Sequence, residues 1–310
     1  MKPQGARLTG TQPVTWSIGL LALTANFFWS GNIVSIKVGL ATIPPLWSAF
    51  WRMAVAVLVV AVWTKATGDA VLVRRRQVRR MLLLSVLFTA QIATFNLAIQ
   101  YTSPAYAVIL LNTNPILINL ISHFFAHDDR LTGKRLFGLA IAFGGISYVM
   151  LGQPDARLAP DPTLGNALML LSALLLAVRI VYTQHLVQRM DPLRPVIWQM
   201  ALSIPWFLGF GAALEAPLLK PLGYEPVLAI LYQGVVVAGF CFVTWTKLLQ
   251  RCSAGNLAVF GFTVPIFGIL LSWTVLDEHI TGRVLAGAAA VAAGITIVTR
   301  AKQTEAADAV

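Results

Sequence analysis

Charged residues are scarce in this chain of 310 residues, since Asp, Glu, Lys and Arg together make up only 11% of it. A soluble domain carries about 25% of them. Hydrophobic residues reach 57% and the mean hydropathy is +0.75. The shortage of charge excludes an ordinary soluble fold and predicts an all-α polytopic membrane protein.

Residues that carry redox, metal or acid–base chemistry are also few. Cys241 and Cys252 form no C-x-x-C pair and no disulfide framework. The chain has 4 histidines, and no Asp or Glu lies in the middle of an apolar segment. The sequence also lacks a phosphate-binding G-x-x-x-x-G-K-[ST] loop. We therefore predict no enzyme activity, no metal site, no cofactor and no proton relay.

Several apolar segments are long enough to cross a bilayer, which takes about 20 residues of helix. Proline, glycine or charge marks most of the short connections between them, and no connection is long enough for a separate domain. We predict ten transmembrane helices, at residues 14–39, 45–63, 81–101, 104–125, 134–151, 165–188, 193–213, 226–249, 254–275 and 281–299.

The basic residues lie mainly in alternate connections. With the N-terminus inside, the outer loops hold only Arg157, Lys220 and Arg283. By the positive-inside rule, both termini are predicted to be cytoplasmic. The arginine run at 74–80 is predicted to bind anionic lipid, so the net charge of +11 does not indicate nucleic acid. We expect a multi-pass protein of a bacterial-type inner membrane.

The two halves of the sequence repeat each other. The first repeat is predicted at 1–151, the second at 165–300, and a cytoplasmic tail at 301–310. Because each repeat has five predicted helices, an odd number, the second copy is expected to be inverted in the membrane. The matched pairs include Pro115-Ile116 with Pro265-Ile266, Ser122 with Ser272, Gly138 with Gly287, Gly145 with Gly294, and Pro45-Leu46…Trp51-Arg52-Met53-Ala54 with Pro192-Leu193…Trp198-Gln199-Met200-Ala201.

Inverted repeats with interrupted helices are typical of secondary transporters, whose substrates bind near the midplane between the repeats. Pro115 removes a backbone donor, so the carbonyl of Leu111 is expected to lose its helical partner. Pro115 and Pro265 are therefore predicted hinges, with a static kink as the alternative. The duplication alone is also compatible with a merely stable bundle. Gly138, Gly145 and their matches are predicted to allow close helix contact, within the chain or in a homodimer.

A family resemblance follows from two kinds of motif. Each repeat ends with an acidic pair, a Leu/Ile-Thr-Gly-Lys/Arg run and a glycine-rich helix, and the first helix carries Ala25, Asn26, Phe27, Trp29, Ser30 and Lys37. The sequence resembles the EamA repeats of the drug/metabolite transporter superfamily over nearly its whole length. The resemblance implies a ten-helix transporter, similar in architecture to the YddG-type aromatic amino acid exporters. The same superfamily contains nucleotide-sugar and sugar-phosphate translocators.

Four basic residues fall inside the predicted spans. Lys37 and Arg52 lie near outer helix ends and Lys247 near an inner end, so each either reaches the interface or takes part in transport. Arg179 lies more than two turns inside its helix. Its fork suits a carboxylate or phosphate, although its position also allows it to reach the inner headgroups.

Polar and aromatic residues near the middle of the spans are the candidates for a substrate cavity. Asn112 and Asn119 are seven residues apart and are predicted to share one helical face, whereas Asn114 is predicted to meet a neighbouring helix. Asp128, Asp129, Asp277 and Glu278 are predicted to cap the fifth and tenth helices. The candidates for substrate binding are Trp29, Asn32, Asn96, Asn112, Asn119, Arg179, Tyr182, Trp245 and Phe260.

A cavity with one polar wall and one aromatic wall suits an amphipathic small molecule. The sequence therefore predicts a secondary exporter of small metabolites, amino acids first and aromatic ones among them. The alternative is a carrier of sugar phosphates or nucleotide sugars. That alternative requires several of Lys37, Arg179 and Lys247 to meet in one cavity.

Overall fold

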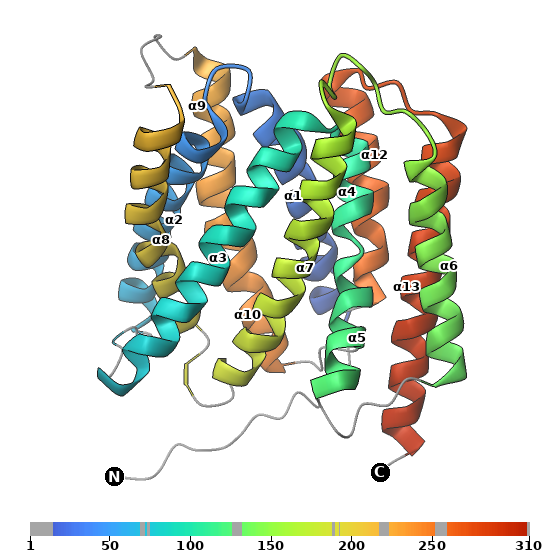
Figure 1. Cartoon of the computed structure of the whole chain (residues 1–310). Coiled ribbons are helices and arrows are strands. Elements are labelled where there is room, and N and C mark those ends of the chain that lie inside the picture. Colours follow the sequence, from blue (N-terminus) through green and yellow to red (C-terminus); the bar gives the residue numbers. More distant parts are fainter. Residues whose placement is uncertain are drawn as a thin grey trace.

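The computed structural model describes residues 15–68, 72, 75–125, 132–187, 190–191, 193–216, 223–251 and 259–308, and its regular elements in those ranges are all helices. Figure 1 shows them as one bundle. The elements are α1 (Trp16–Gly39), α2 (Pro45–Thr67), α3 (Arg75–Tyr101), α4 (Pro104–Leu111), α5 (Asn114–Phe125), α6 (Gly133–Met150), α7 (Pro162–Val187), α8 (Leu193–Leu214), α9 (Tyr224–Leu231), the π-helix η1 (Tyr232–Cys241), α10 (Phe242–Arg251), the 3-10 helix η2 (Val259–Phe262), α12 (Thr263–Leu276) and α13 (Gly282–Asp308).

Among the described residues, 6 helical stretches are long and apolar enough to cross a membrane: α1, α2, α3, α8, Pro162–Thr183 of α7 and the continuous run Tyr224–Trp245. Shorter apolar helices cover Pro104–Ile118, Thr263–Leu276 and Gly282–Val298. Large apolar side chains such as Val62 (70% exposed) and Phe143 (67%) point outward, as expected for a surface that faces lipid. The chain is thus a multi-pass membrane protein, while the full count of ten spans stays a prediction.

Contacts between the two halves recur with the roles of the halves exchanged. Helix α3 packs on α7, while α1 packs on α9 and η1. In the same way α1 contacts α12, while α7 contacts α4 and α5. Helix α2 packs on α8, and α6 packs on α13. This reciprocity is the pattern that two copies of one unit produce around an approximate two-fold axis.

Glycines line the contact between α6 and α13. A Cβ added at Gly138 would lie 2.9 Å from the carbonyl oxygen of Gly294, and one at Gly145 would lie 2.9 Å from that of Gly287. Gly145 follows Gly138 in α6, whereas its partner Gly287 precedes Gly294 in α13. The two helices are therefore antiparallel, and Figure 1 shows them side by side. The close helix contact predicted from these glycines is therefore found within the chain.

The fourth predicted span is interrupted. Helix α4 ends at Leu111, Asn112 and Thr113 form a turn, and α5 begins at Asn114. Pro115 is therefore in the first turn of α5, where a missing N–H costs no hydrogen bond. The carbonyl of Leu111 accepts a hydrogen bond from Asn114 Nδ2 at 3.1 Å. The prediction that Asn114 meets a neighbouring helix is wrong, because its amide replaces the donor that the broken helix lacks.

The ninth predicted span changes form at the matching position. The 3-10 turn η2 gives way to α12 at Thr263, two residues before Pro265, just as Thr113 stands two residues before Pro115. Here side chains of α1 donate hydrogen bonds to the backbone of the interrupted span. Asn26 Nδ2 donates to the carbonyl of Phe260 at 2.7 Å, and Ser30 Oγ donates to the carbonyl of Val264 at 3.0 Å.

Replacing Asn26 by leucine is expected to destabilise this junction. The carbonyl of Phe260 would keep the hydrogen bond from Thr263 Oγ1 at 2.7 Å. Loss of the Asn26 hydrogen bond costs about 0.5–1.5 kcal/mol, which should lower the midpoint of thermal unfolding by a few degrees. Thr24→Val is the matched control, because the hydroxyl of Thr24 is exposed and bonds only within α1, to Leu20 O at 2.8 Å. The measurement is unfolding of the purified protein in detergent, and equal midpoints for the two variants would refute the role of Asn26.

The carboxylates at the helix ends act across the fold. Glu278, predicted to cap the last helix, accepts a hydrogen bond from Ala105 N of α4 at 3.1 Å and another from the Ser272 hydroxyl. That prediction is wrong because Thr281 Oγ1 serves α13 instead, accepting from Val284 N at 3.4 Å. Asp277 contributes its backbone carbonyl to Arg157. Asp128 and Asp129 lie outside the described residues.

The loop that joins the halves also contacts the segment between α12 and α13. Arg157 Nη2 lies 2.7 Å from Asp155 Oδ2, and His279 N donates to the same oxygen at 3.1 Å. The hydrogen bond from Arg157 is the main reason that the pKa of Asp155 lies well below its usual range. The loop after α6 is therefore fixed to the segment that leads into α13.

Candidate functional site

Two of the four basic residues inside the predicted spans, Lys37 and Lys247, make contacts within the fold. Lys37 Nζ donates to the carbonyls of Ile99, Gln100 and Thr102 at 2.7, 3.1 and 3.0 Å, so its charge neutralises the C-terminal end of α3. Lys247 Nζ lies 5.1 Å from the ring centroid of Trp63 in a cation–π contact. Neither ammonium group is positioned to clamp a substrate.

Arg52 lies inside the bundle. It is only 3% exposed, and its Nε and Nη2 have no hydrogen-bond partner in the part of the chain that the structure describes. Arg52 is seven residues from the start of α2, about 10 Å along the helix axis. The interpretation that it reaches the membrane interface is therefore wrong. The sequence shows its depth along the helix but not which face of α2 turns inward.

Arg179 is also buried, at 8% exposed, but it has a partner. Its Nη1 donates to Gln199 Oε1 at 3.1 Å, and its guanidinium carbon lies 5.2 Å from the ring centroid of Phe88. Of the two alternatives left open for Arg179, the structure supports a buried side chain and not one that extends to the headgroups. Its Nε has no partner among the described residues.

The arginines occupy related positions in the two repeats. Pro45 matches Pro192, an offset of 192 − 45 = 147 residues, and the same offset pairs Arg52 with Gln199. Applied to α1 and α7, it pairs Asn32 with Arg179. Each half thus has one arginine and one amide. The first half has the amide in α1 and the arginine in α2, whereas the second half has the arginine in α7 and the amide in α8. Arg179 and Gln199 are hydrogen-bonded to each other, whereas Asn32 Oδ1 and the Nε and Nη2 of Arg52 are without partners in the described residues.

A row of buried polar side chains runs along α3. Ser85, Thr89 and Asn96 are four and seven residues apart, which places them on one helical face. Each has a side-chain oxygen without a hydrogen-bond partner in the described residues. We call these three residues the α3 polar row. Ile92, on the same face, belongs to an apolar cluster with Met53 of α2 and Met200 of α8, so the row faces the helices that carry Arg52 and Gln199.

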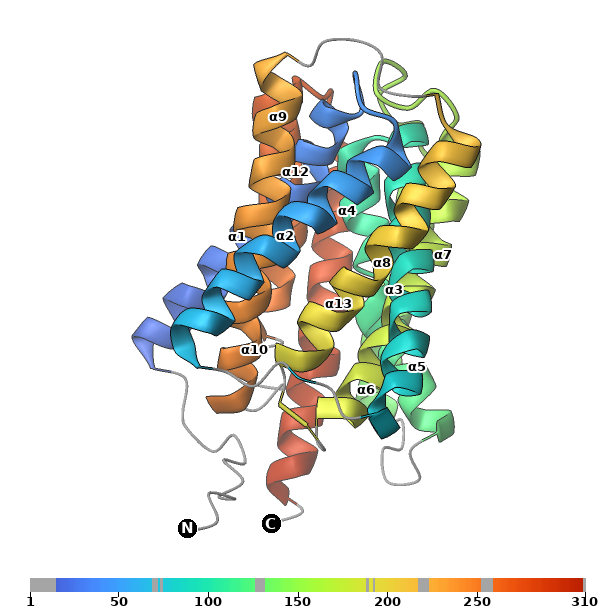
Figure 2. The same ribbon diagram turned by 90° about the vertical axis from the view of Figure 1, so that its left-hand side faces the viewer.

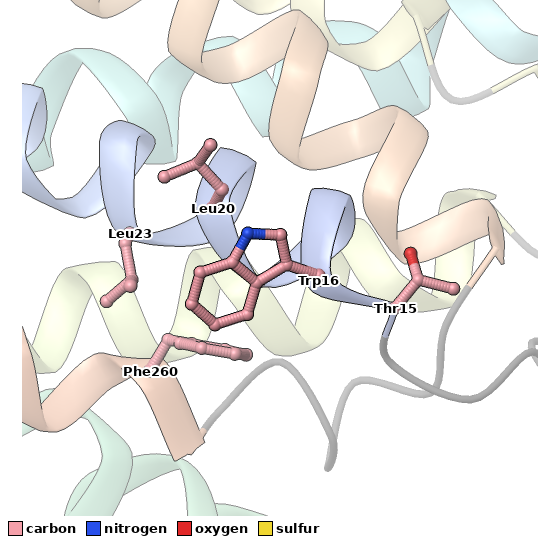
Figure 3. A pocket seen from close by; sticks show the side chains of 6 residues that line it. Thr15, Trp16, Leu20, Leu23 and Phe260 are labelled. Atoms are coloured by element: carbon pink, nitrogen blue, oxygen red, sulfur yellow. The ribbon is translucent and has the colours of Figure 1, made fainter.

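The predicted aromatic wall forms a separate group. The rings of Trp29 and Trp245 meet edge to face with centroids 5.1 Å apart, and Phe242 lies 6.0 Å from Trp29. Trp245 and Phe260 pack beside Ile18 at the start of α1. Figure 3 shows Phe260 at an open pocket there, with Trp16, Leu20 and Leu23. This pocket is mainly apolar and lies away from both arginines.

The remaining candidates lie apart from one another. Asn112 Nδ2 donates to Val108 O of its own helix at 2.7 Å. Because the helix breaks after it, the seven-residue spacing to Asn119 does not define a continuous face, and the side chain of Asn119 lies outside the described residues. The Tyr182 hydroxyl donates to Arg80 O at 3.3 Å, near the start of α3. Asn32 is buried in α1.

The cation set required for a phosphate carrier does not assemble. Lys37 is at the C-terminal end of α3, Lys247 is beside Trp63 near the C-terminal end of α2, and Arg179 is level with Phe88. Figures 1 and 2 show that α2 and α3 end on opposite sides of the bundle. Gln199 and Ser85 were not among the residues that the sequence predicted for the substrate cavity, and Arg52 was predicted either to reach the interface or to take part in transport. The spacing of the α3 polar row was the signal that could have found Ser85.

Comparison with known proteins gives the family. The model of the EamA-like transporter family matches the chain twice, over residues 16–151 and 163–300. The chain belongs to the EamA-like transporter family. The resemblance seen in the sequence is thereby confirmed, and the two matches place one copy of the family unit in each half. The buried arginines and amides described above therefore belong to a transporter.

Relatives within the EamA-like transporter family cover almost the whole chain. A protein of Escherichia coli named "probable amino-acid metabolite efflux pump" is 28% identical over 290 residues, 90% of this chain and 93% of its own length. An uncharacterized transporter of Bacillus subtilis is 22% identical over 279 residues, 90% and 94% of the two chains. One solved crystal structure, 18% identical, superposes with a TM-score of 0.69 over 94% of this chain and 99% of its own, which supports the fold.

Proposed function

We propose that this transporter exports small amphipathic metabolites, amino acids in particular and aromatic ones among them, by alternating access between its two halves. The observation that carries the proposal is the α3 polar row. Its buried oxygens have no partner among the described residues, and they lie on a face of α3 that packs against the helices of the buried Arg52 and Gln199. Unpaired polar groups inside a membrane protein are costly, so they are retained where they meet a polar substrate or water. The name of the Escherichia coli relative agrees with amino acid export.

The proposed topology is ten spans in two inverted five-helix repeats, with both termini in the cytoplasm of a bacterial-type inner membrane. The antiparallel glycine contacts of α6 and α13 support the inversion, because matched helices of inverted copies run in opposite directions. Helix α1 begins and α13 ends on the same side of the bundle (Figures 1 and 2). The basic residues of the connections support the cytoplasmic location of that side.

The proposed hinges are the two interruptions before Pro115 and Pro265. A turn at Asn112–Thr113 and a 3-10 turn at η2 leave few helical hydrogen bonds to break when one half of the span moves. Polar side chains satisfy the backbone at both places, which allows the bend without an unpaired carbonyl. Rocking of the helix pairs around these points would expose the α3 polar row to each side in turn.

The test is efflux from proteoliposomes that contain the full-length protein. We expect a panel of amino acids to leave loaded vesicles faster than from protein-free vesicles, while glucose 6-phosphate and UDP-glucose stay inside. Because no carboxylate or histidine of the described residues lies in the polar row, the rate should not depend on a pH gradient. Movement of the phosphate esters alone would contradict the proposal, and accumulation driven by a pH gradient would contradict its uncoupled form.

A further inference from the structure

We propose that Arg52 binds the carboxylate of the transported substrate, beside acceptors supplied by Asn96 and Ser48. This inference rests on the proposed function and names the substrate class for its central site: molecules with one carboxylate next to a hydrogen-bond donor, such as α-amino acids. It goes beyond membership of the family, which identifies no binding group.

The Arg52 guanidinium lacks hydrogen-bond partners at two of its nitrogens in the described part of the chain. A buried charge is costly unless it is paired and hydrogen-bonded. Lys37, Lys247 and Arg179 each have a partner, but Arg52 Nε and Nη2 have none in the described ranges of the chain. The guanidinium fork matches the two oxygens of a carboxylate in a bidentate pair. A carboxylate that arrives with the substrate supplies the missing partner.

The direction of the Arg52 side chain follows from its place in α2. Side chains of a helix point back towards its N-terminus, so Arg52 is directed towards the first turns of α2. Ser48, four residues before Arg52, lies on the same face, and its buried hydroxyl has no partner among the described residues. At the start of α2, the carbonyl of Pro45 accepts a hydrogen bond from Asn96 Nδ2 at 2.9 Å. Arg52 is therefore directed along α2 towards the position where Asn96 of the α3 polar row contacts that helix.

The hydrogen bond to Pro45 fixes the orientation of the Asn96 amide. An amide oxygen cannot donate to a carbonyl oxygen, so the Asn96 atom that bonds to Pro45 O is the nitrogen. Asn96 Oδ1 is then fixed as an acceptor, and it has no partner in the described residues. A single guanidinium with acceptors nearby suits a monoanion that also carries an ammonium group. A phosphate dianion would require more positive charge, and Lys37 is already bonded to three carbonyls.

The experiment compares each amino acid with its carboxamide, which keeps the ammonium group and lacks the negative charge. The ligands are L-phenylalanine, L-leucine and L-threonine, each beside its amide, and binding to the purified full-length protein in detergent is measured by calorimetry, with efflux from proteoliposomes in parallel. Loss of a bidentate charged pair reduces affinity by about 30-fold or more. The wild type should prefer the carboxylate by about that factor, and Arg52→Gln should abolish the preference while its affinity for the amide is unchanged.

The controls separate folding from recognition. Unchanged affinity of Arg52→Gln for the carboxamide shows that the variant is folded, and Arg52→Lys, which keeps the charge without the fork, should show an intermediate preference. Lys247→Gln removes another intramembrane charge and should keep the wild-type preference, because Lys247 faces Trp63. If Arg52→Gln still prefers the carboxylate as the wild type does, the inference is overturned while the proposed function stands. If the wild type neither binds nor moves any amino acid, the proposed function fails and the inference fails with it.

Discussion

Replacement of Gly145 by leucine is expected to lower the midpoint of thermal unfolding by about 5–10 °C, because overpacking a tight contact costs about 1–3 kcal/mol or more. A Cβ at Gly145 would lie 2.8 Å from Ala290 Cβ, 2.9 Å from the Gly287 carbonyl oxygen and 3.2 Å from Val291 N. Two of these three atoms belong to the backbone of α13, so α6 and α13 would have to separate along their length.

Gly144 offers a matched control one residue away. A Cβ at Gly144 meets nothing within 4 Å, so Gly144→Leu adds the same side chain to the exposed face of the same helix. Its midpoint should stay within about 2 °C of the wild type, since surface substitutions change stability by about 0.5 kcal/mol or less. Thermal unfolding in one detergent measures both variants. Equal losses of stability at the two positions would contradict the close α6–α13 contact.

Substitution of Lys37 by methionine is expected to have the second large effect, a decrease of about 2–4 kcal/mol in the free energy of unfolding. The three carbonyls that Lys37 bonds lie at the C-terminal end of α3, where helical carbonyls lack N–H partners and carry partial negative charge. Methionine keeps the apolar stem and removes the donors. We expect a lower unfolding midpoint and faster hydrogen exchange of the backbone around Thr102, whose N–H donates to Ala98 O.

The comparison for Lys37 is Lys247→Met, which removes a single cation–π contact worth about 0.5–2 kcal/mol. Lys37→Met should therefore unfold at a clearly lower temperature than Lys247→Met. If both variants unfold together with the wild type, the carbonyls at the end of α3 are satisfied by water and the role assigned to Lys37 is wrong.

The helices of this fold follow from the sequence more directly than the site does. Lengths of apolar sequence and the prolines and glycines between them predicted the helical segments, because the bilayer sets how many residues a span requires. The interruption near Pro115 was also predicted, but its position was not. The side chains of Asn112 and Asn114 donate hydrogen bonds to backbone carbonyls. These bonds compete with the hydrogen bonds of a continuous helix, so the turn forms before the proline and not at it.

The site depends on contacts that sequence order does not reveal. Arg52 and Arg179 both carry a charge inside a predicted span, and the sequence left open whether Arg179 reaches the headgroups. Arg52 looked like an interface residue because depth says nothing about which way a helix is rotated, and the packing of α2 against α8, η1 and α3 sets that rotation. Glu278 illustrates the same point, because its partner Ala105 is 173 residues away in the chain.

The seam between α6 and α13 has a consequence for biosynthesis. Helix α13 leaves the ribosome well after α6, and its glycine face fits a helix whose own glycines, Gly138 and Gly145, were inserted about 150 residues earlier. Until α13 arrives, that face of α6 lacks its partner. The close α6–α13 contact thus waits for α13, so a chain truncated before Gly282 would present an unmatched face of α6 to the proteases that survey membrane proteins.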